Sequence, residues 1–204
     1  MEEVSAFVLA GGRSSRMGAD KALLSLGGES FLAIALRNAQ AVCSKPAIVG
    51  EAARYAAFGR VVEDRFTGCG PLGGIHAALC ATTSELNVIL SVDLPLMVPD
   101  FLRWLVGQAD GGEELITVPR IHGRCEPLCA VYRRATLPVV EQALREGDFK
   151  VDRIFGGVAT RYAGDAEIRA AGFPDDIFRN VNTPEDYACV KGQVQPSEAA
   201  QGQG

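Results

Sequence analysis

Short apolar runs alternate along the chain with segments whose apolar residues recur at helical spacing. The runs typical of strands cover residues 6–9, 47–49, 61–62, 88–92, 115–118 and 128–132, with a last strand near residues 178–181. The helical segments cover residues 31–43, a helix that opens at 75–79, and residues 136–145. Strands and helices that alternate in this way predict an α/β fold with a single doubly wound, mostly parallel sheet.

The end of the chain carries clear signals for a last helix. Thr183 can cap this helix, Pro184 fits its first position, and Asp186 stands three residues after the cap. After Lys191 the chain has too little apolar surface to order itself. We therefore expect one folded domain over residues 1–191 and a disordered tail over residues 192–204.

The composition is that of an ordinary globular protein. Of the 204 residues, 48% are hydrophobic and 22% are charged, and the length suits one domain of about 150 residues with little left over. A net charge of −5 disfavours a nucleic-acid-binding protein, because such proteins usually carry a basic excess. The chain has no apolar stretch of membrane-spanning length, and Glu2 and Glu3 stand where a secretory signal is basic. We expect a cytoplasmic protein with no membrane partner.

Six cysteines are scattered along the chain without a C-x-x-C pair or the spacing of a zinc site. Cys125 and Cys129 form the one close pair. We expect all six to be reduced thiols, most of them buried as small packing residues.

A glycine- and cation-rich loop follows the first apolar run. Residues 9–21 read Leu-Ala-Gly-Gly-Arg-Ser-Ser-Arg-Met-Gly-Ala-Asp-Lys. Glycines such as Gly11 and Gly12 let the backbone approach a ligand closely, while Arg16 and Lys21 bring positive charge to the same loop. A strand that opens into such a loop is typical of nucleotide binding.

Two common phosphate-binding motifs are excluded at this loop. A Walker loop requires Lys and then Ser or Thr after its last glycine, but Gly18 is followed by Ala19 and Asp20. The dinucleotide fingerprint requires a second glycine two residues after the first, where Arg13 stands.

Acidic side chains follow two of the predicted strands. Asp93 ends the most apolar strand, at the edge where open α/β sheets bind their ligands. It either holds Mg²⁺ together with nucleotide phosphates or starts the turn that follows it. Asp64 precedes a glycine-rich helix entrance at residues 68–74. It either accepts a hydrogen bond from a base or ribose or closes a turn.

Further polar residues are candidates for the same region. Glu126, Asn180 and Asn182 can each reach the mouth of the sheet, or they can serve as a solvated charge and as turn residues. We expect His76 to be a surface or packing residue and not a catalyst, since its neighbours look like helix interior and suggest no pair of nucleophile and base.

At these motifs the chain resembles a known family. The motifs are Leu-Ala-Gly-Gly at 9–12, Arg-Met-Gly at 16–18 with Lys21, Gly-Pro-Leu-Gly-Gly at 70–74, Asp-Leu-Pro at 93–95 and Asn-Val-Asn-Thr-Pro-Glu-Asp at 180–186. Over about residues 5–190 the chain is similar to the molybdenum cofactor guanylyltransferases (MobA). The resemblance implies a fold of the nucleotide-diphospho-sugar transferase type and makes residues 1–191 a nucleotidyltransferase domain.

The resemblance also implies an activity. This activity is the transfer of GMP from GTP to the terminal phosphate of molybdopterin, which releases pyrophosphate and forms molybdopterin guanine dinucleotide. The implied cofactor is Mg²⁺, the substrates are GTP and molybdopterin, and molybdoenzymes or cofactor carriers are transient partners.

Residue roles follow from the same resemblance. The residues implied in nucleotide contact are Leu9, Ala10, Gly11, Gly12, Lys21, Asp64 and Asp93, with Asn180 and Asn182 near molybdopterin. Catalysis is assigned to Arg16, Lys21 and Asp93, with Asp93 also the ligand of Mg²⁺. The family commonly has Asn after its second strand, and here Gly50 takes that position.

The chemistry needs no protein nucleophile. A phosphate monoester has a second pKa of about 6 and is mostly dianionic at neutral pH, so the reaction needs charge neutralisation and in-line alignment.

Three alternatives remain open. A cytidylyltransferase for the same cofactor typically reads Leu-Ala-Ala-Gly in its first motif, so Gly11 favours guanine. A sugar-1-phosphate nucleotidyltransferase is disfavoured by the motifs at 71–74 and 180–186. A carrier that binds the nucleotide or cofactor without catalysis is disfavoured by the presence of Lys21 and Asp93.

Overall fold

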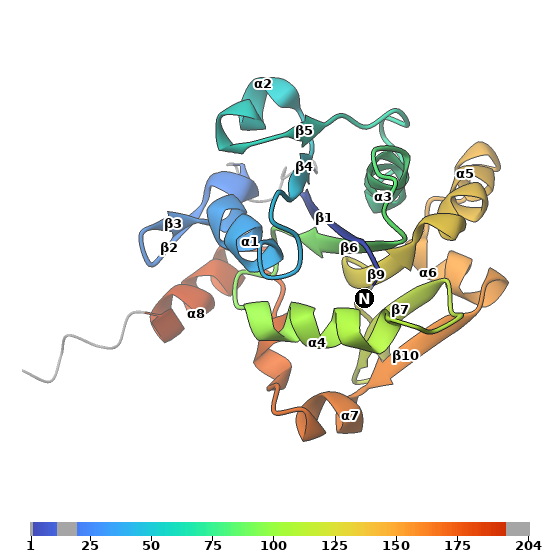
Figure 1. The fold of residues 1–204 in the computed structure, drawn as a ribbon. Helices are drawn as coiled ribbons and strands as arrows, with labels where there is room; N and C mark the ends of the chain where they lie inside the picture. Colours follow the sequence, from blue (N-terminus) through green and yellow to red (C-terminus); the bar gives the residue numbers. More distant parts are fainter. Residues whose placement is uncertain (1, 12–19, 195–204) are drawn as a thin grey trace, which may run out of the picture.

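A central eight-stranded sheet organises the computed structural model, which describes residues 2–11 and 20–194 (Figure 1). The strand order is β10-β7-β9-β6-β1-β4-β5, and β8 pairs with β7. The strands are β1 (Val4–Leu9), β4 (Ala47–Val49), β5 (Val61–Val62), β6 (Leu86–Ser91), β7 (Ile116–Ile121), β8 (Arg124–Cys125), β9 (Cys129–Arg133) and β10 (Thr160–Gly164). A two-stranded hairpin of β2 (Ser25–Leu26) and β3 (Glu29–Ser30) stands apart from this sheet.

The sheet is mostly parallel, as the sequence predicts. Neighbouring strands pair in parallel from β6 through β1 and β4 to β5, and β10 pairs in parallel with β7. The strand β9 runs antiparallel to both of its neighbours, β6 and β7. Because the parallel strands point the same way, their carboxyl ends meet at one edge of the sheet. The beginning of β9 lies at this edge too.

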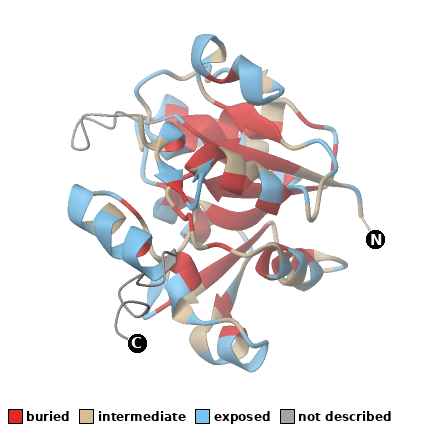
Figure 2. Cartoon of the chain, turned by 90° about the vertical axis from the view of Figure 1, so that its left-hand side faces the viewer, coloured by how far each residue is buried: buried red, intermediate tan, exposed pale blue. Residues whose placement is uncertain are grey.

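Helices cover both faces of the sheet. On one face pack α1 (Phe31–Ala39), α4 (Pro99–Ala109) and α7 (Asp165–Ala170), and on the other pack α3 (Pro71–Cys80), α5 (Leu137–Arg145) and α6 (Val151–Ile154). The alternation of β1 shows how the sequence serves both cores: Ala6 and Val8 point to the first face, and Phe7 and Leu9 point to the second. Figure 2 shows the resulting buried layer along the strands.

The last helix, α8 (Pro184–Val194), begins as the sequence predicts. The Thr183 hydroxyl accepts a hydrogen bond from the Asp186 amide at 3.1 Å, and the Asp186 carboxylate accepts one from the Thr183 amide at 2.8 Å. This reciprocal pair is a capping box. The helix continues to Val194, three residues past the expected domain boundary, and residues 195–204 of the expected tail lie outside the described part.

Three expectations about secondary structure are wrong. The helix expected to open at residues 75–79 begins earlier, at Pro71, where proline fits the first helical position of α3. The predicted strand near residues 178–181 is replaced by the 3-10 turn η5 (Asp175–Phe178) and an irregular segment. In this segment the Val181 amide donates to the Asp93 carbonyl at 2.9 Å, so Val181 is bound to a loop and not to a strand. The helix predicted over residues 31–43 is shorter than expected. It ends at Ala39, and a turn follows it.

The cysteines confirm one expectation and correct another. All six are free, but only Cys129 is buried; Cys189 is exposed and the other four are partly buried, so the expectation that most are buried is wrong. Among residues 2–11 and 20–194, no helix is long and apolar enough to cross a membrane.

Candidate functional site

The carboxyl edge of the sheet gathers the predicted nucleotide-binding residues that the structure describes. The Ala10 amide donates to the Val49 carbonyl at 3.0 Å, and the Val92 amide donates to the Leu9 carbonyl at 3.2 Å. The ends of β4, β1 and β6 therefore lie side by side, with Asp93 next to the last of them. Of the predicted residues, Gly12 and Arg16 lie outside the described residues, and their roles stay predictions.

Leu9, Ala10 and Gly11 differ in what they offer a ligand. The side chains of Leu9 and Ala10 are buried in the two cores, so only their backbone groups can face a nucleotide. Gly11 is exposed. A Cβ built on Gly11 would meet Gly50 Cα at 3.8 Å and the Val49 carbonyl at 3.9 Å, which are ordinary contacts. Packing within the described residues does not require glycine at this position.

Lys21 joins the two ends of the sequence at this edge. It lies at the start of the 3-10 turn η1 (Lys21–Leu23), and its ammonium donates to the Asn182 side-chain oxygen at 2.6 Å. Burial raises the pKa of Asp93, and the charge of the same ammonium opposes this rise. The structure therefore brings Lys21, Asp93 and Asn182 into one group.

Asp93 is a partly buried carboxylate. The Ser91 hydroxyl joins the Lys21 ammonium in opposing the effect of burial on its pKa. With its amide nitrogen turned to Asp93, Asn180 donates to Oδ1 at 3.1 Å and to Oδ2 at 3.3 Å. Asn180 therefore contacts Asp93, and this pair of side chains faces the edge of the sheet.

Glu126 also belongs to this group. From the sequence alone, it could equally be a solvated charge at a strand end. Burial raises the pKa of Glu126 to about 7, a contact with the Asn180 amide partly offsets this effect, and the charge of Asp93 adds to it. The Ser91 amide donates to the Leu128 carbonyl at 2.8 Å, which places the residues before β9 beside the end of β6. The direction of β9 brings Glu126 here, and no local motif in the sequence marks that direction.

Asp64 closes a turn at the entrance to α3. Its Oδ1 accepts a hydrogen bond from the Phe66 amide at 2.8 Å. A Cβ on Gly73 would lie 2.6 Å from Asp64 Oδ2 and 2.8 Å from the Phe66 carbonyl, so only glycine fits at the first turn of α3. Burial raises the pKa of Asp64. Its predicted contact with the nucleoside stays a prediction.

His76 packs inside the protein, which is one of the two positions expected from the sequence. It is 3% exposed, and its ring meets the Phe66 ring edge-on at a centroid distance of 4.8 Å. Burial lowers the pKa of His76, so the ring is neutral and serves packing.

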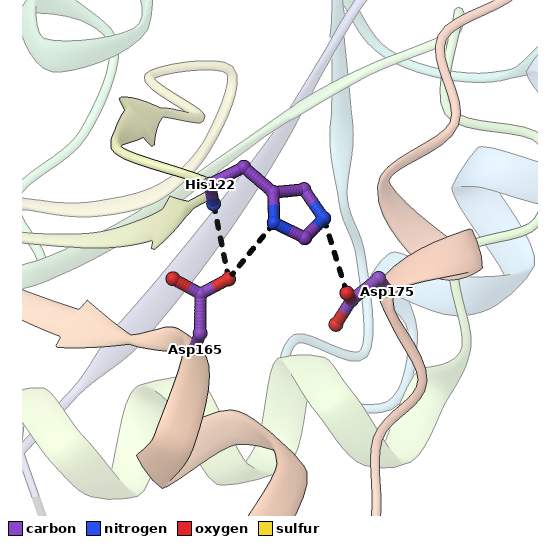
Figure 3. A group of neighbouring side chains, drawn as sticks. All are labelled: His122, Asp165 and Asp175. Carbon is purple, nitrogen blue, oxygen red and sulfur yellow. Dashed lines mark hydrogen bonds and ion pairs between the residues drawn. The ribbon is translucent and has the colours of Figure 1, made fainter.

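A second polar group lies at the same sheet edge, on the flank formed by β7 and β10. His122 Nε2 lies 3.1 Å from an Asp175 oxygen, and His122 Nδ1 lies 3.7 Å from an Asp165 oxygen (Figure 3). These three residues have the types and spacing of metal ligands. The Arg169 guanidinium, however, lies 2.8 Å from Asp175 and 3.6 Å from Asp165. Its single positive charge offsets part of the charge of the two carboxylates, so the arrangement is that of an exposed ion-pair network.

Comparisons with known proteins agree with this geometry. A sequence model of the family described as "MobA-like NTP transferase domain" matches residues 6–162. The chain is 34% identical over 204 residues to a probable molybdenum cofactor guanylyltransferase of Pelotomaculum thermopropionicum, in a match that covers 99% of this chain and 98% of the relative. It is 34% identical over 188 residues to a protein of the same description from Carboxydothermus hydrogenoformans, with coverage of 92% and 94%.

A solved structure confirms the predicted fold class. The crystal structure of molybdopterin-guanine dinucleotide biosynthesis protein A from Archaeoglobus fulgidus superposes with a TM-score of 0.82 at 24% identity. The superposition covers 93% of this chain and 97% of that one. The mostly parallel sheet with helices on both faces is therefore shared along almost the full length of both chains.

Proposed function

The chain belongs to the family of MobA-like NTP transferases, and from this premise we propose that it transfers GMP from GTP to the terminal phosphate of molybdopterin. The reaction releases pyrophosphate and forms molybdopterin guanine dinucleotide. The observation that carries the proposal is the meeting of Lys21, Asp93, Asn180 and Asn182 at one edge of the sheet. Similarity along nearly the full length to relatives described as probable molybdenum cofactor guanylyltransferases supports the same substrates.

The donor set at this edge fits Mg²⁺. Asp93 and Glu126 supply carboxylate oxygens, which Mg²⁺ prefers, and the pKa of each is raised by burial. A cation held by Asp93 would relieve the cost of that buried negative charge. When bound, Mg²⁺ supplies charge neutralisation at the triphosphate.

The protein's own groups supply position and charge. The exposed backbone at Gly11 leaves space for the nucleotide, and the Lys21 ammonium offsets negative charge that grows on the departing pyrophosphate. Asn180 holds the Asp93 carboxylate through its amide. The attacking phosphate of molybdopterin is already mostly dianionic at neutral pH, so the reaction needs no strong base and no covalent intermediate on the protein.

Asn182 is the link toward the acceptor. Its side-chain oxygen accepts a hydrogen bond from the Lys21 ammonium, and its backbone amide donates to Asp186 at 2.9 Å. The start of α8 therefore holds Asn182 beside the Lys21 ammonium. In this proposal, the molybdopterin phosphate approaches from the side of Asn180 and Asn182 while the GTP phosphates lie on the side of Gly11 and Lys21.

Pyrophosphate release from each of the four nucleoside triphosphates tests the proposal. The assay contains Mg²⁺ and is run with and without molybdopterin-loaded acceptor. Release with GTP that depends on the acceptor supports the proposal. Equal or faster release with CTP would assign the chain to the cytidylyltransferases instead. Binding of GTP without release under any condition would indicate a carrier. The assay is repeated with a sugar 1-phosphate as the acceptor, and release that depends on it would indicate a sugar-1-phosphate nucleotidyltransferase.

A further inference from the structure

A buried tyrosine connects the two flanks of the glycine- and cation-rich segment. Tyr55, at the end of α2 (Ala52–Tyr55), is 2% exposed. Its hydroxyl oxygen lies 2.8 Å from Asp20 Oδ2 and 3.2 Å from the Ala10 carbonyl oxygen, and these two acceptors share its single proton, with the shorter contact to Asp20. Ala10 follows β1 directly, and Asp20 precedes η1 directly. One hydroxyl thus bridges backbone and side-chain groups that are ten residues apart in the sequence.

Asp20 passes this connection on to Lys21. The other oxygen of Asp20, Oδ1, accepts from the Ala22 amide at 3.1 Å and so caps the 3-10 turn that carries Lys21. The Arg54 guanidinium lies 3.6 Å from Asp20 Oδ2 as an exposed second partner. The position of the Lys21 ammonium at the sheet edge therefore depends on a carboxylate that Tyr55 holds.

The Tyr55 ring also accounts for Gly50. A Cβ built on Gly50 would lie 2.9 Å from both the Cδ2 and Cε2 atoms of the Tyr55 ring, and 3.6 Å from the Gly11 amide nitrogen. Gly50 is not among the glycines with a positive φ, so its backbone does not require glycine. The ring occupies the space that any side chain at position 50 would need.

The helix α2 is itself fixed at the same edge. The Ala52 amide donates to the Glu63 side chain at 3.1 Å, and the Tyr55 amide donates to the Glu51 carbonyl at 3.2 Å. The first bond ties the start of α2 to the residue after β5, and the second is the helix's own backbone bond, so Tyr55 extends from a helix that is attached at this edge.

We propose that Tyr55 is a positioning residue for triphosphate binding, which holds Ala10 and Asp20 in fixed relation and thereby sets the place of Lys21. The inference rests on the proposed function. Tyr55 is too buried to touch the nucleotide, so it acts through the groups it holds. Burial and the Asp20 carboxylate raise the pKa of Tyr55, so the hydroxyl stays a hydrogen-bond donor across the working pH range.

The variant Tyr55→Phe tests the hydroxyl while it keeps the ring over Gly50. We expect the KM for GTP and the Kd for a fluorescent GTP analogue to rise about tenfold, a size in keeping with one hydrogen bond to a charged acceptor. The KM for molybdopterin-loaded acceptor should stay within about twofold of wild type, because Tyr55 holds groups on the nucleotide side. The kcat should fall as well, since the Lys21 ammonium also offsets charge on the departing pyrophosphate. The matched control is Tyr162→Phe, which removes the hydroxyl of an exposed tyrosine on β10 and should change neither constant.

Unchanged nucleotide affinity in Tyr55→Phe would overturn the inference, as would an equal loss for GTP and for the acceptor. The Kd for the fluorescent GTP analogue does not depend on turnover, so it tests the role of Tyr55 separately from the proposed function. If wild-type protein releases no pyrophosphate from GTP, the proposed function fails, yet the ratio of triphosphate affinities still decides the role of Tyr55.

A second pair of variants tests the ring. Gly50→Ala should weaken GTP binding several-fold when Tyr55 is present, because its methyl group meets the ring. In a Tyr55→Ala background the same change should cost little, since the ring is gone. An equal cost in both backgrounds would refute the role of the ring.

Discussion

Replacing Glu126 with glutamine should stabilise the free protein more at pH 8 than at pH 5. Glu126 has its pKa raised from 4.5 to about 7 by burial first of all. Between these two values the folded protein binds more protons than the unfolded chain, so the free energy of unfolding falls as the pH rises through this window. Glutamine keeps the shape of the side chain and carries no charge at either pH.

The size of the effect follows from the displacement of the pKa. At about 1.4 kcal/mol for each pH unit, a displacement from 4.5 to about 7 corresponds to roughly 3 kcal/mol. Glu126 is only half-buried, and solvent screening reduces this figure to about 1–2 kcal/mol. We therefore expect Glu126→Gln to gain about 1–2 kcal/mol at pH 8, with most of that gain lost at pH 5, where the wild-type carboxyl is protonated in the folded state.

Urea unfolding at fixed ionic strength measures this difference, in the presence of a chelator and without nucleotide. The matched control is Glu113→Gln, which changes an exposed glutamate and should shift stability equally at both pH values. A gain for Glu126→Gln that is the same at pH 5 and pH 8 would refute the reasoning. A loss at pH 8 would show that the ionised carboxylate has a stabilising partner at this edge.

Three further variants test separate parts of the structure. Asp93→Ala should lower GTP-dependent pyrophosphate release by roughly 100-fold or more, and turnover within tenfold of wild type would exclude Asp93 from catalysis. Lys21→Ala should raise the KM for GTP by roughly tenfold to 100-fold, the range for one charge-assisted hydrogen bond, and an unchanged KM would contradict its phosphate role. Gly73→Ala should destabilise the protein by about 1–3 kcal/mol, because its Cβ would lie 2.6 Å from the Asp64 carboxylate; thermal unfolding that matches wild type would show that this turn relaxes freely.

The sequence predicts the central strands of the sheet better than its edge strands. The strand β6 is a nearly unbroken apolar run, buried on both faces, so its composition alone identifies a central strand. The edge strand β10 has the sequence Thr-Arg-Tyr-Ala-Gly, and it cannot be identified from its composition because such a polar run resembles a loop. The apolar residues near 178–181 look like a strand instead, although they fill the core beside Asp93 from a 3-10 turn and an irregular segment.

Some residues of the candidate site can be predicted from the sequence, and others cannot. Asp93 can be located from the sequence because the residue after a central parallel strand reaches the ligand-binding edge. Glu126 cannot, since its placement depends on β9 running against its neighbours. In the sequence, Gly50 stands where the family commonly has Asn, with no visible reason. In the structure, the Tyr55 ring occupies the space that a side chain at position 50 would need. Long-range pairing of this kind leaves no local pattern.

The hydrogen bond between Lys21 and Asn182 has a consequence for the order in which this protein becomes competent during synthesis. Its two partners are 161 positions apart, and Asn182 is among the last residues of the described chain to be made. The strands β1 to β10 all precede Asn182, so a nascent chain can form its sheet while the edge still lacks this partner. Competence at this edge is therefore gained late, when the segment before α8 joins a sheet that is already complete.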